Sequence, residues 1–266
     1  MAMQAKKACE KIAILPALLK NTILMEMADE LEKQEAFILG ENKKDVLSAG
    51  KSKLSAALIQ RLTLNNELIK GMAEALRDIA CLEDPIGQVM ETWARPNGLR
   101  ISKVRVPLGV IAIIYESRPD VTVDCIGLCL KSGNVSLLRG GKESLHSNRA
   151  LFSVLESVAK RYHLPLGSMN LIDRTEHEAI GVLLQLSDYI SLVIPRGGEA
   201  LIKMVVAQSK IPVIKHYKGI CHTFIDEDCD LEMAEKICIN AKVQKPGVCN
   251  AMETLLVHKN IAKKFL

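Results

Sequence analysis

The sequence predicts an α/β fold in which an open, mostly parallel sheet is covered by helices on both faces and preceded by amino-terminal helices. Apolar residues recur at helical spacing through the first hundred residues. From residue 110 to residue 214, short apolar runs of strand length alternate with amphipathic segments of helix length. This alternation favours right-handed crossovers, which bring the carboxyl ends of the strands, where ligands bind, to one edge of the sheet.

The amino-terminal region is expected to be helical because two sets of apolar residues recur every three or four positions. These sets are Leu24, Met27, Ala28 and Leu31, and Leu68, Met72, Leu76 and Ile79. Charged residues fill the opposite faces. Asp84-Pro85 and the segment 95–98 (Arg-Pro-Asn-Gly) interrupt the pattern, so we expect the helical region to end there.

Five strands and four helices are expected in the α/β region. The strands are predicted over 110–115, 135–138, 169–172, 189–194 and 211–214, and the helices near 121–130, 151–160, 180–186 and 199–208. A second unit follows, with a strand at 222–225, a helix near 231–240, a Pro-Gly loop and a strand at 253–257.

The expected domains are 1–219, which holds the amino-terminal helices and a nucleotide-binding α/β domain, and 220–266. The second segment is shorter than the usual minimum of about 50 residues for an independent domain. We therefore expect either an appendage of the first domain or an incomplete polypeptide.

Composition argues against several classes of function. The 35 Lys and Arg exceed the 31 Asp and Glu by only four charges, and four Phe, four Tyr and one Trp could stack on bases, so no nucleic-acid partner is expected. No apolar run approaches the roughly 20 residues of a membrane span. A cytoplasmic location is the default expectation, and the eight cysteines lack the C-x-x-C spacing of a metal or redox motif, which suits reduced thiols.

Two loops that follow predicted strands each contain a pair of glycines beside cations. The first loop is Arg139-Gly140-Gly141-Lys142, and the second is Arg196-Gly197-Gly198, which opens a helix. One interpretation is contact with a nucleotide phosphate, because a side chain would hold the backbone away from a pyrophosphate. The alternative is a pair of tight strand-to-helix turns, and the incomplete G-x-G-x-x-G spacing leaves both interpretations open.

Cys249 follows a Pro-Gly turn and lies close to Lys245, so it is the candidate nucleophile. A nearby cation and backbone N–H groups stabilise a thiolate, the reactive form of cysteine. The alternative is a small buried apolar residue, the commoner role of a free cysteine. A metal site at His216, Cys221 and His222 is not expected, because adjacent strand residues point to opposite faces. Asp226 and Asp228 are interpreted as a solvated helix cap.

Several stretches resemble one enzyme family closely. They are RPNGLRISKVRVPLGVIAIIYESRPDVTVD, CLKSGNVSLLRGGKESLHSN, LVIPRGGEALI, IPVIKHYKGICH and QKPGVCNAMETLLVH, and the amino-terminal stretch LSAALIQRLTLN is also similar. By these motifs the chain resembles the gamma-glutamyl phosphate reductase (glutamate-5-semialdehyde dehydrogenase) family of the aldehyde dehydrogenase superfamily. The resemblance runs essentially from end to end, and it implies an aldehyde-dehydrogenase-like, Rossmann-like sheet and a role in the second step of proline biosynthesis.

The resemblance implies a chemical role for the PGVCN motif. Cys249 would attack the acyl phosphate of L-glutamate 5-phosphate, phosphate would leave, and NADPH would reduce the resulting thioester to glutamate 5-semialdehyde. The backbone N–H of Cys249 and the amide of Asn250 are the candidate donors to the developing oxyanion. No metal is implied.

The resemblance also implies a cofactor site and a substrate site. Arg139 and Lys142 would lie near the adenosine ribose, where their charge suits the 2′-phosphate of NADP(H). The remaining implied cofactor residues are Gly140, Gly141, Arg196, Gly197 and Gly198, with the last two near the pyrophosphate. Ser117, Arg118 and Asp120 are the implied substrate contacts, although many relatives have Asn at the position of Asp120.

The chain departs from its relatives at three places. Hydrolytic aldehyde dehydrogenases carry a water-activating E-L-G-G motif at the position of His216-Tyr217-Lys218-Gly219. The absence of that motif suits a reductase, which must protect its thioester from water. Lys245 replaces the usual arginine before PGVCN. The family's members are roughly 400 residues long, in keeping with two full domains and homo-oligomers, so we expect most of the catalytic domain to be missing. The alternative function is accordingly a truncated, noncatalytic nucleotide-binding remnant.

Overall fold

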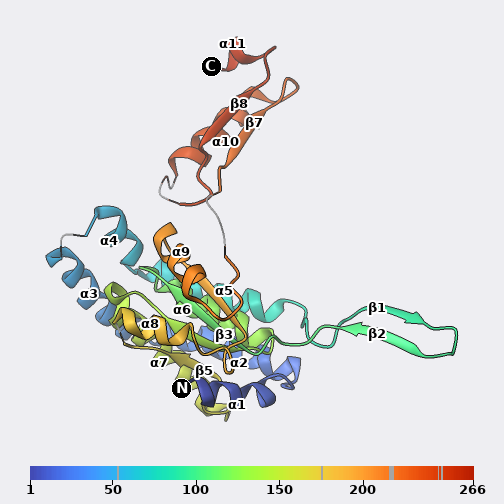
Figure 1. Cartoon of the computed structure of the whole chain (residues 1–266). Coiled ribbons are helices and arrows are strands. Elements are labelled where there is room, and N and C mark those ends of the chain that lie inside the picture. Colours follow the sequence, from blue (N-terminus) through green and yellow to red (C-terminus); the bar gives the residue numbers. More distant parts are fainter. Residues whose placement is uncertain (53, 175, 216–218, 245, 247) are drawn as a thin grey trace. The chain divides into compact units, whose positions relative to one another are not determined.

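The computed structural model describes residues 1–266 except 53, 175, 216–218, 245 and 247 (Figure 1). The chain divides into two compact units, Met1–Lys215 and His216–Leu266.

The amino-terminal region is helical, as the spacing of apolar residues predicts, and its described residues form five helices. They are α1 (Ala2–Ile12), α2 (Ala17–Lys33), α3 (Glu35–Lys51), α4 (Ala56–Leu62) and α5 (Asn66–Cys81). Side chains mark two of the helix starts, since Ser55 accepts a hydrogen bond from Leu58 N–H and Asn65 from Leu68 N–H. Leu68 itself is exposed, and Ile69 takes the buried place that the spacing assigned to Leu68.

An exposed antiparallel hairpin follows, which the sequence analysis did not predict. Its strands are β1 (Val89–Ala94) and β2 (Arg100–Val104), and Figure 1 shows them extending away from the helices and the sheet of their unit. The break predicted at 95–98 forms the turn of this hairpin. Gly98 adopts φ +84 there, and Arg95 N–H donates to Leu99 O at 2.8 Å.

The central sheet is parallel and has the strand order β5-β4-β3-β6. Its strands are β3 (Val110–Tyr115), β4 (Val135–Arg139), β5 (Met169–Leu171) and β6 (Leu192–Arg196). The connecting helices are α6 (Asp120–Lys131), α7 (Leu145–Arg161), α8 (His177–Leu183) and α9 (Glu199–Gln208), with the short 3₁₀ helix η1 (Lys142–Ser144) before α7. The predicted alternation of strands and helices and the parallel α/β class are confirmed.

The strand predicted at 211–214 is wrong, because only an isolated bridge joins Val213 to Val193. Val193 N–H donates to Pro212 O, and Ile214 N–H donates to Val193 O. Pro212 has no N–H of its own, so a regular ladder does not extend through it. The strand predicted from Tyr189 begins only at Leu192, because Tyr189 N–H closes a turn onto Leu186 O.

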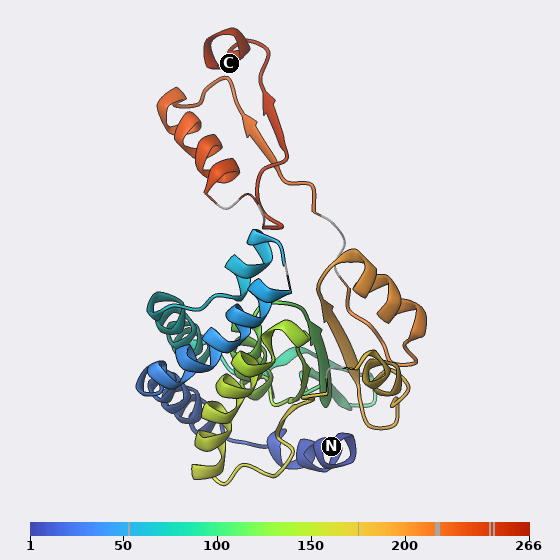
Figure 2. The same ribbon diagram turned by 90° about the vertical axis from the view of Figure 1, so that its left-hand side faces the viewer.

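Helices cover both faces of the sheet (Figure 2). Alternate residues of β3 point to opposite faces: Ile111, Ile113 and Tyr115 pack with α2, α5, α6 and α7, whereas Val110, Ala112 and Ile114 pack with α1, α8 and α9. Because both faces are buried, β3 is a continuous apolar run, as is typical of a parallel sheet.

The second unit pairs β7 (His222–Ile225) with β8 (Thr254–Val257) in parallel, joined by α10 (Leu231–Val243), and ends in α11 (Ala262–Phe265). β7, α10 and β8 match the elements predicted for the segment, whereas α11 was not predicted. The cap of α10 is Asp230, whose carboxylate accepts from Met233 N–H at 2.9 Å. Asp226 and Asp228, the predicted cap residues, lie exposed in the turn before it.

Candidate functional site

The carboxyl edge of the parallel sheet brings together three of the predicted loops. They follow β3, β4 and β6, and they carry Ser117 and Arg118, the segment 139–142, and the segment 196–198, respectively. Parallel strands end at the same edge, so the strand directions alone gather the loops. Two carboxylates, Glu116 and Glu143, then tie them to one another.

The turn after β3 is strained and is held by Glu143. Ser117 is buried and adopts φ +39, a left-handed conformation that is uncommon for a residue with a side chain. One oxygen of Glu143 accepts hydrogen bonds from both Ser117 N–H, at 2.8 Å, and Ser117 Oγ, at 2.6 Å. A strained backbone conformation that surrounding contacts hold in place is typical of functional sites.

The loop after β4 is packed tightly against the protein itself. A Cβ at Gly140 would overlap the amide of Asn148, and one at Gly141 would overlap the carboxylate of Glu143. The Asn148 amide donates to Ser144 Oγ at 3.0 Å. Both glycines are thus required by contacts within the chain, in addition to any requirement of a bound pyrophosphate.

A buried chain of hydrogen bonds supports the same loop from below. The Tyr115 hydroxyl bonds Thr122 Oγ1 at 2.7 Å, and Thr122 Oγ1 donates to Asn148 Oδ1 at 3.2 Å. Burial raises the pKa of Tyr115 well above its usual range, so the phenol stays protonated. The network fixes the start of α7 relative to β3 and α6.

The two cations of this loop differ in exposure. Lys142 is exposed, whereas Arg139 is buried at the end of β4. Burial lowers the pKa of the Arg139 guanidinium, and the carboxylates of Glu143, Glu116 and Glu176 act in the opposite direction. Lys142 is therefore the cation of this loop that faces solvent.

The loop after β6 opens α9 and is held by Glu116. Gly198 N–H donates to Glu116 Oε2 at 2.8 Å. A Cβ at Gly197 would lie 2.5 Å from the same oxygen, whereas at Gly198 the nearest atom would be 3.8 Å away. Gly197 therefore makes room for the Glu116 carboxylate, and Gly198 leaves open space beside the exposed Arg196.

Arg118 and Asp120 lie at the start of α6, in the predicted substrate loop. Both are partly exposed, and Arg118 Nε lies 4.0 Å from Asp120 Oδ2. One turn later, burial raises the pKa of Asp124, and the charge of Asp120 adds to this effect. The start of α6 thus carries Arg118 beside Asp120, with Asp124 one turn further along the helix.

Cys249 lies in an exposed turn of the second unit. Ala251 N–H donates to Val248 O at 3.3 Å, which makes Cys249 and Asn250 the two central residues of the turn. Both are exposed, so the alternative of a buried structural cysteine is wrong for Cys249. Lys245 lies outside the described residues.

Sequence reasoning missed three residues at these sites. Glu116 and Glu143 are adjacent to predicted residues, yet their contacts span 82 and 26 residues of sequence. The third is Cys221, whose thiol donates to the backbone oxygen of Cys249 at 3.4 Å. An acidic side chain beside each candidate loop was the only available signal for the first two, and none existed for Cys221.

Other candidate sites in the described part of the chain are weak. No group of three or more His, Cys, Asp or Glu in it could hold a metal ion, and His216 of the rejected metal site lies outside it, as do Tyr217 and Lys218. No helix formed by the described residues has the length and hydropathy needed to cross a membrane.

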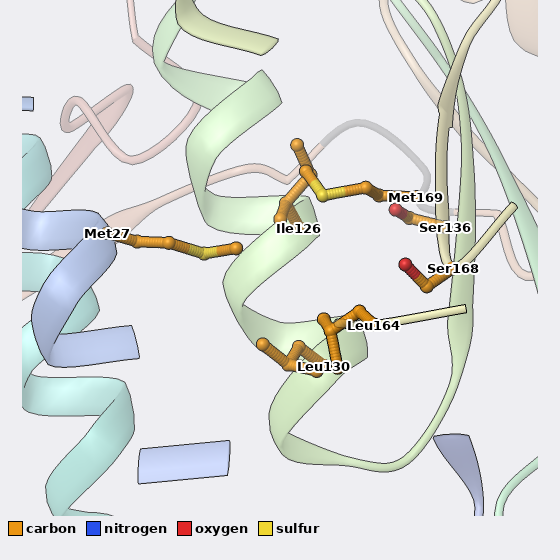
Figure 3. A pocket seen from close by; sticks show the side chains of 7 residues that line it. All are labelled: Met27, Ile126, Leu130, Ser136, Leu164, Ser168 and Met169. Carbon is orange, nitrogen blue, oxygen red and sulfur yellow. The ribbon is translucent and has the colours of Figure 1, made fainter. Parts of the chain in front are cut away.

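A small internal cavity of about 10 Å³ lies within the first unit. Figure 3 shows Met27 reaching toward it opposite Met169 and Ser136, with Ile126 and Leu130 from α6 beside it. Such a volume can hold about one water molecule, so it is a packing defect rather than a ligand site.

Comparison with known proteins gives a consistent result. The sequence profile of the aldehyde dehydrogenase family matches residues 1–266. Gamma-glutamyl phosphate reductases from Citrifermentans bemidjiense and Caldanaerobacter subterraneus are 49% and 50% identical to this chain over 266 and 265 residues. The chain spans 64% of the length of each of these relatives.

Solved structures agree with the sequence comparison. The gamma-glutamyl phosphate reductase from Thermotoga maritima superposes with a TM-score of 0.89 at 42% identity, covering 99% of this chain and 64% of that protein. The Saccharomyces cerevisiae structure of the same name gives 0.76 at 34% identity, with 99% and 66% covered. A probable aldehyde dehydrogenase from Listeria monocytogenes, 16% identical with a TM-score of 0.73, shares the fold.

Proposed function

The chain belongs to the aldehyde dehydrogenase family, and we propose that it carries the cofactor-binding and nucleophile-bearing part of a gamma-glutamyl phosphate reductase. The proposed reaction is the NADPH-dependent reduction of L-glutamate 5-phosphate to L-glutamate 5-semialdehyde and phosphate, a step of proline biosynthesis. The observation that carries the proposal is the likeness to proteins of that name at 49% identity over all 266 residues.

Cys249 is the proposed nucleophile. Its place in an exposed turn leaves the thiol open to an acyl phosphate, and attack there would release phosphate and leave a thioester. The amide of Asn250, the next residue of the turn, and the Cys249 backbone N–H are the proposed donors to the oxyanion.

The carboxyl edge of the sheet is the proposed cofactor site, and its residues fit a dinucleotide. Gly198 opens α9 beside free space, and Lys142 and Arg196 are exposed cations at the neighbouring loops. Arg139, Gly140, Gly141 and Gly197 would shape the loops that receive NADP(H). When bound, NADPH supplies the hydride for the reduction.

The substrate carboxylate and amine are proposed to meet the turn after β3. Arg118 would attract the carboxylate, Asp120 would face the amine, and the strained Ser117 would hold the turn in place. Charge pairs of this kind orient a small zwitterionic substrate.

The proposal is tested in the reverse direction, as phosphate-dependent reduction of NADP by glutamate semialdehyde. We expect the Cys249→Ala variant to lose this activity while still binding NADPH. Cys81→Ala is the matched control, because Cys81 is the other exposed cysteine of the chain and lies on α5. Equal loss in both variants would contradict the assignment of the nucleophile.

The same measurements separate the two candidate functions. NADPH binding without any turnover in the unmodified chain would favour a nucleotide-binding segment that needs further sequence for catalysis. Absence of NADPH binding would contradict both. Replacing NADP by NAD in the assay tests the proposed preference for the 2′-phosphate, and we expect Lys142→Ala to reduce that preference.

A further inference from the structure

Cys221 lies against the turn that carries Cys249. We propose that a peroxide converts Cys221 and Cys249 into an intramolecular disulfide, a reversible modification that withdraws the Cys249 thiol from reaction. The consequence for catalysis rests on the proposed function, whereas the formation of the bond does not.

Cys221 contacts Cys249 and the residues that follow it at the start of β8. The Cys221 thiol donates to Cys249 O at 3.4 Å, while the Cys221 carbonyl accepts from Glu253 N–H at 2.9 Å and Thr254 N–H at 3.1 Å. The two cysteines are thus kept together by contacts to β8 as well as to the turn itself, all within the second unit.

The Cys221 thiol reaches the backbone of Cys249. The carbonyl oxygen and the Cα of one residue are about 2.4 Å apart, so Cys221 Sγ lies within about 6 Å of the Cα of Cys249. A disulfide requires the two sulfurs to lie about 2 Å apart and the two Cα atoms about 4.4 to 6.8 Å apart, so the turn that carries Cys249 must move toward Cys221 before the bond can form. Rotation of the exposed Cys249 side chain, together with this movement of its turn, would bring the sulfurs together.

Three other thiols of the chain are poor partners. Burial raises the pKa of Cys125 to about 12, and it raises the pKa of Cys129 still further. In the second unit, burial raises the pKa of Cys238, and the adjacent Cys229 adds to that effect. A thiol kept protonated neither attacks a peroxide nor resolves an oxidised cysteine.

The reaction balances in two steps. The Cys249 thiolate attacks one oxygen of hydrogen peroxide, the O–O bond breaks, and hydroxide takes up a proton to leave as water; the product is a sulfenic acid. The Cys221 thiolate then attacks the Cys249 sulfur, so that the S–S bond forms and the S–O bond breaks, with a second hydroxide leaving as water. The two sulfurs lose two electrons in total, and the peroxide gains them.

The test uses the whole chain, reduced, freed of reductant and treated with hydrogen peroxide. Remaining thiols are blocked with N-ethylmaleimide, and the protein is digested without reductant for mass spectrometry. We expect a cross-linked peptide joining Cys221 to Cys249, which dithiothreitol reverses. We also expect Cys249 to lose its reaction with iodoacetamide in the oxidised protein and to regain it after reduction.

Variants of matched chemistry decide the partner. Cys221→Ser should abolish the cross-link and leave oxidised Cys249 in the sulfenic or a higher state, while Cys229→Ser, in the same unit, should retain the cross-link. Circular dichroism shows whether each variant is folded. A bond from Cys249 to Cys229, Cys238 or a second chain, or overoxidation of Cys249 in the unmodified protein, would overturn the proposal. The oxidation experiment contains neither substrate nor cofactor, so its outcome does not depend on whether the chain shows dehydrogenase activity.

Discussion

Lys20 carries a charge into the interior of the first unit, where it pairs with Asp84. Its side chain is only 1% exposed, and Nζ also donates to Lys131 O at 3.0 Å. We expect Asp84→Asn to lower the free energy of unfolding by about 3 to 5 kcal/mol, because it leaves a buried ammonium without its counter-charge. Asparagine can still accept from Ile86 N–H, as Asp84 does, so the change isolates the charge. Urea unfolding measures the effect.

Glu156→Gln is the control for this pair, since its exposed partner Lys160 lies in solvent and the expected change is below about 1 kcal/mol.

Burial acts to raise the pKa of Asp84, but the hydrogen bonds from Lys20 and from Ile86 N–H outweigh this effect and hold that pKa below 3.8. The contribution of Asp84 is therefore complete above pH 3.8 and is lost as the pH falls through the lowered value. Equal acid sensitivity of Asp84→Asn and the unmodified chain would contradict this assignment.

Glu143 and Ser117 form a second test at the scale of single residues. Glu143→Ala removes two hydrogen bonds to a charged acceptor and should destabilise the first unit by about 1.5 to 3 kcal/mol. A glycine tolerates φ +39 without strain, so Ser117→Gly should recover part of the loss in the double variant. Thermal unfolding of the two single variants and the double variant measures the coupling; strictly additive effects would show that Glu143 does not support this turn.

Sequence patterns located the loops of the candidate site but not what holds them. Spacing and turn chemistry identified the glycine pairs at 140–141 and 197–198 because such signals are local. Glu116 and Glu143 act through contacts with residues far along the chain, and only the folded sheet brings these together. For the same reason, no pattern could show that Gly197 makes room for a carboxylate of the protein itself.

At the scale of elements, α7 begins six residues before the predicted start because Asp45, on α3, caps it. The Asp45 carboxylate accepts from His146 N–H at 3.1 Å, from Ser147 N–H at 2.7 Å and from Ser147 Oγ at 2.6 Å. We expect Asp45→Ala to cost about 1 to 2 kcal/mol, because it leaves backbone donors of a buried helix start unsatisfied. Hydrogen exchange should show faster exchange at the first turn of α7, and unchanged protection there would refute the cap.

The hairpin and the strand at 211–214 show where element prediction fails. Pro96-Asn97-Gly98 lies between Trp93 and Ile101, and its turn chemistry predicts only a break, because both flanking strands are exposed and so lack the apolar alternation that marks a half-buried strand. At 211–214 the apolar run is genuine, yet Pro212 limits pairing to a bridge. The strands with two buried faces, β3 and β4, were predicted almost to the residue, since burial imposes their composition.

At the scale of the whole molecule, the two units differ in how completely they cover their apolar residues. The first unit buries both faces of its sheet in two large clusters, whereas the buried cluster of the second consists of Ile225, Ala234 and Cys238. On α10, four large apolar residues are more than half exposed: Met233, Ile237, Ile239 and Val243. An exposed apolar surface of this kind on one helix favours association.

We therefore expect the chain to self-associate, and to do so through α10. In sedimentation velocity, the weight-average sedimentation coefficient should rise with protein concentration. The double variant Ile237→Lys with Val243→Lys should be closer to a monomer, because a charge on each side of the exposed apolar surface opposes its burial against another molecule. Leu128→Lys, at an exposed apolar residue of α6 in the first unit, adds the same single charge as Ile237→Lys or Val243→Lys alone, and we expect it to leave association unchanged. A concentration-independent monomer of the unmodified chain would contradict the expectation, and an effect of equal size from the Leu128 substitution would move the contact away from α10.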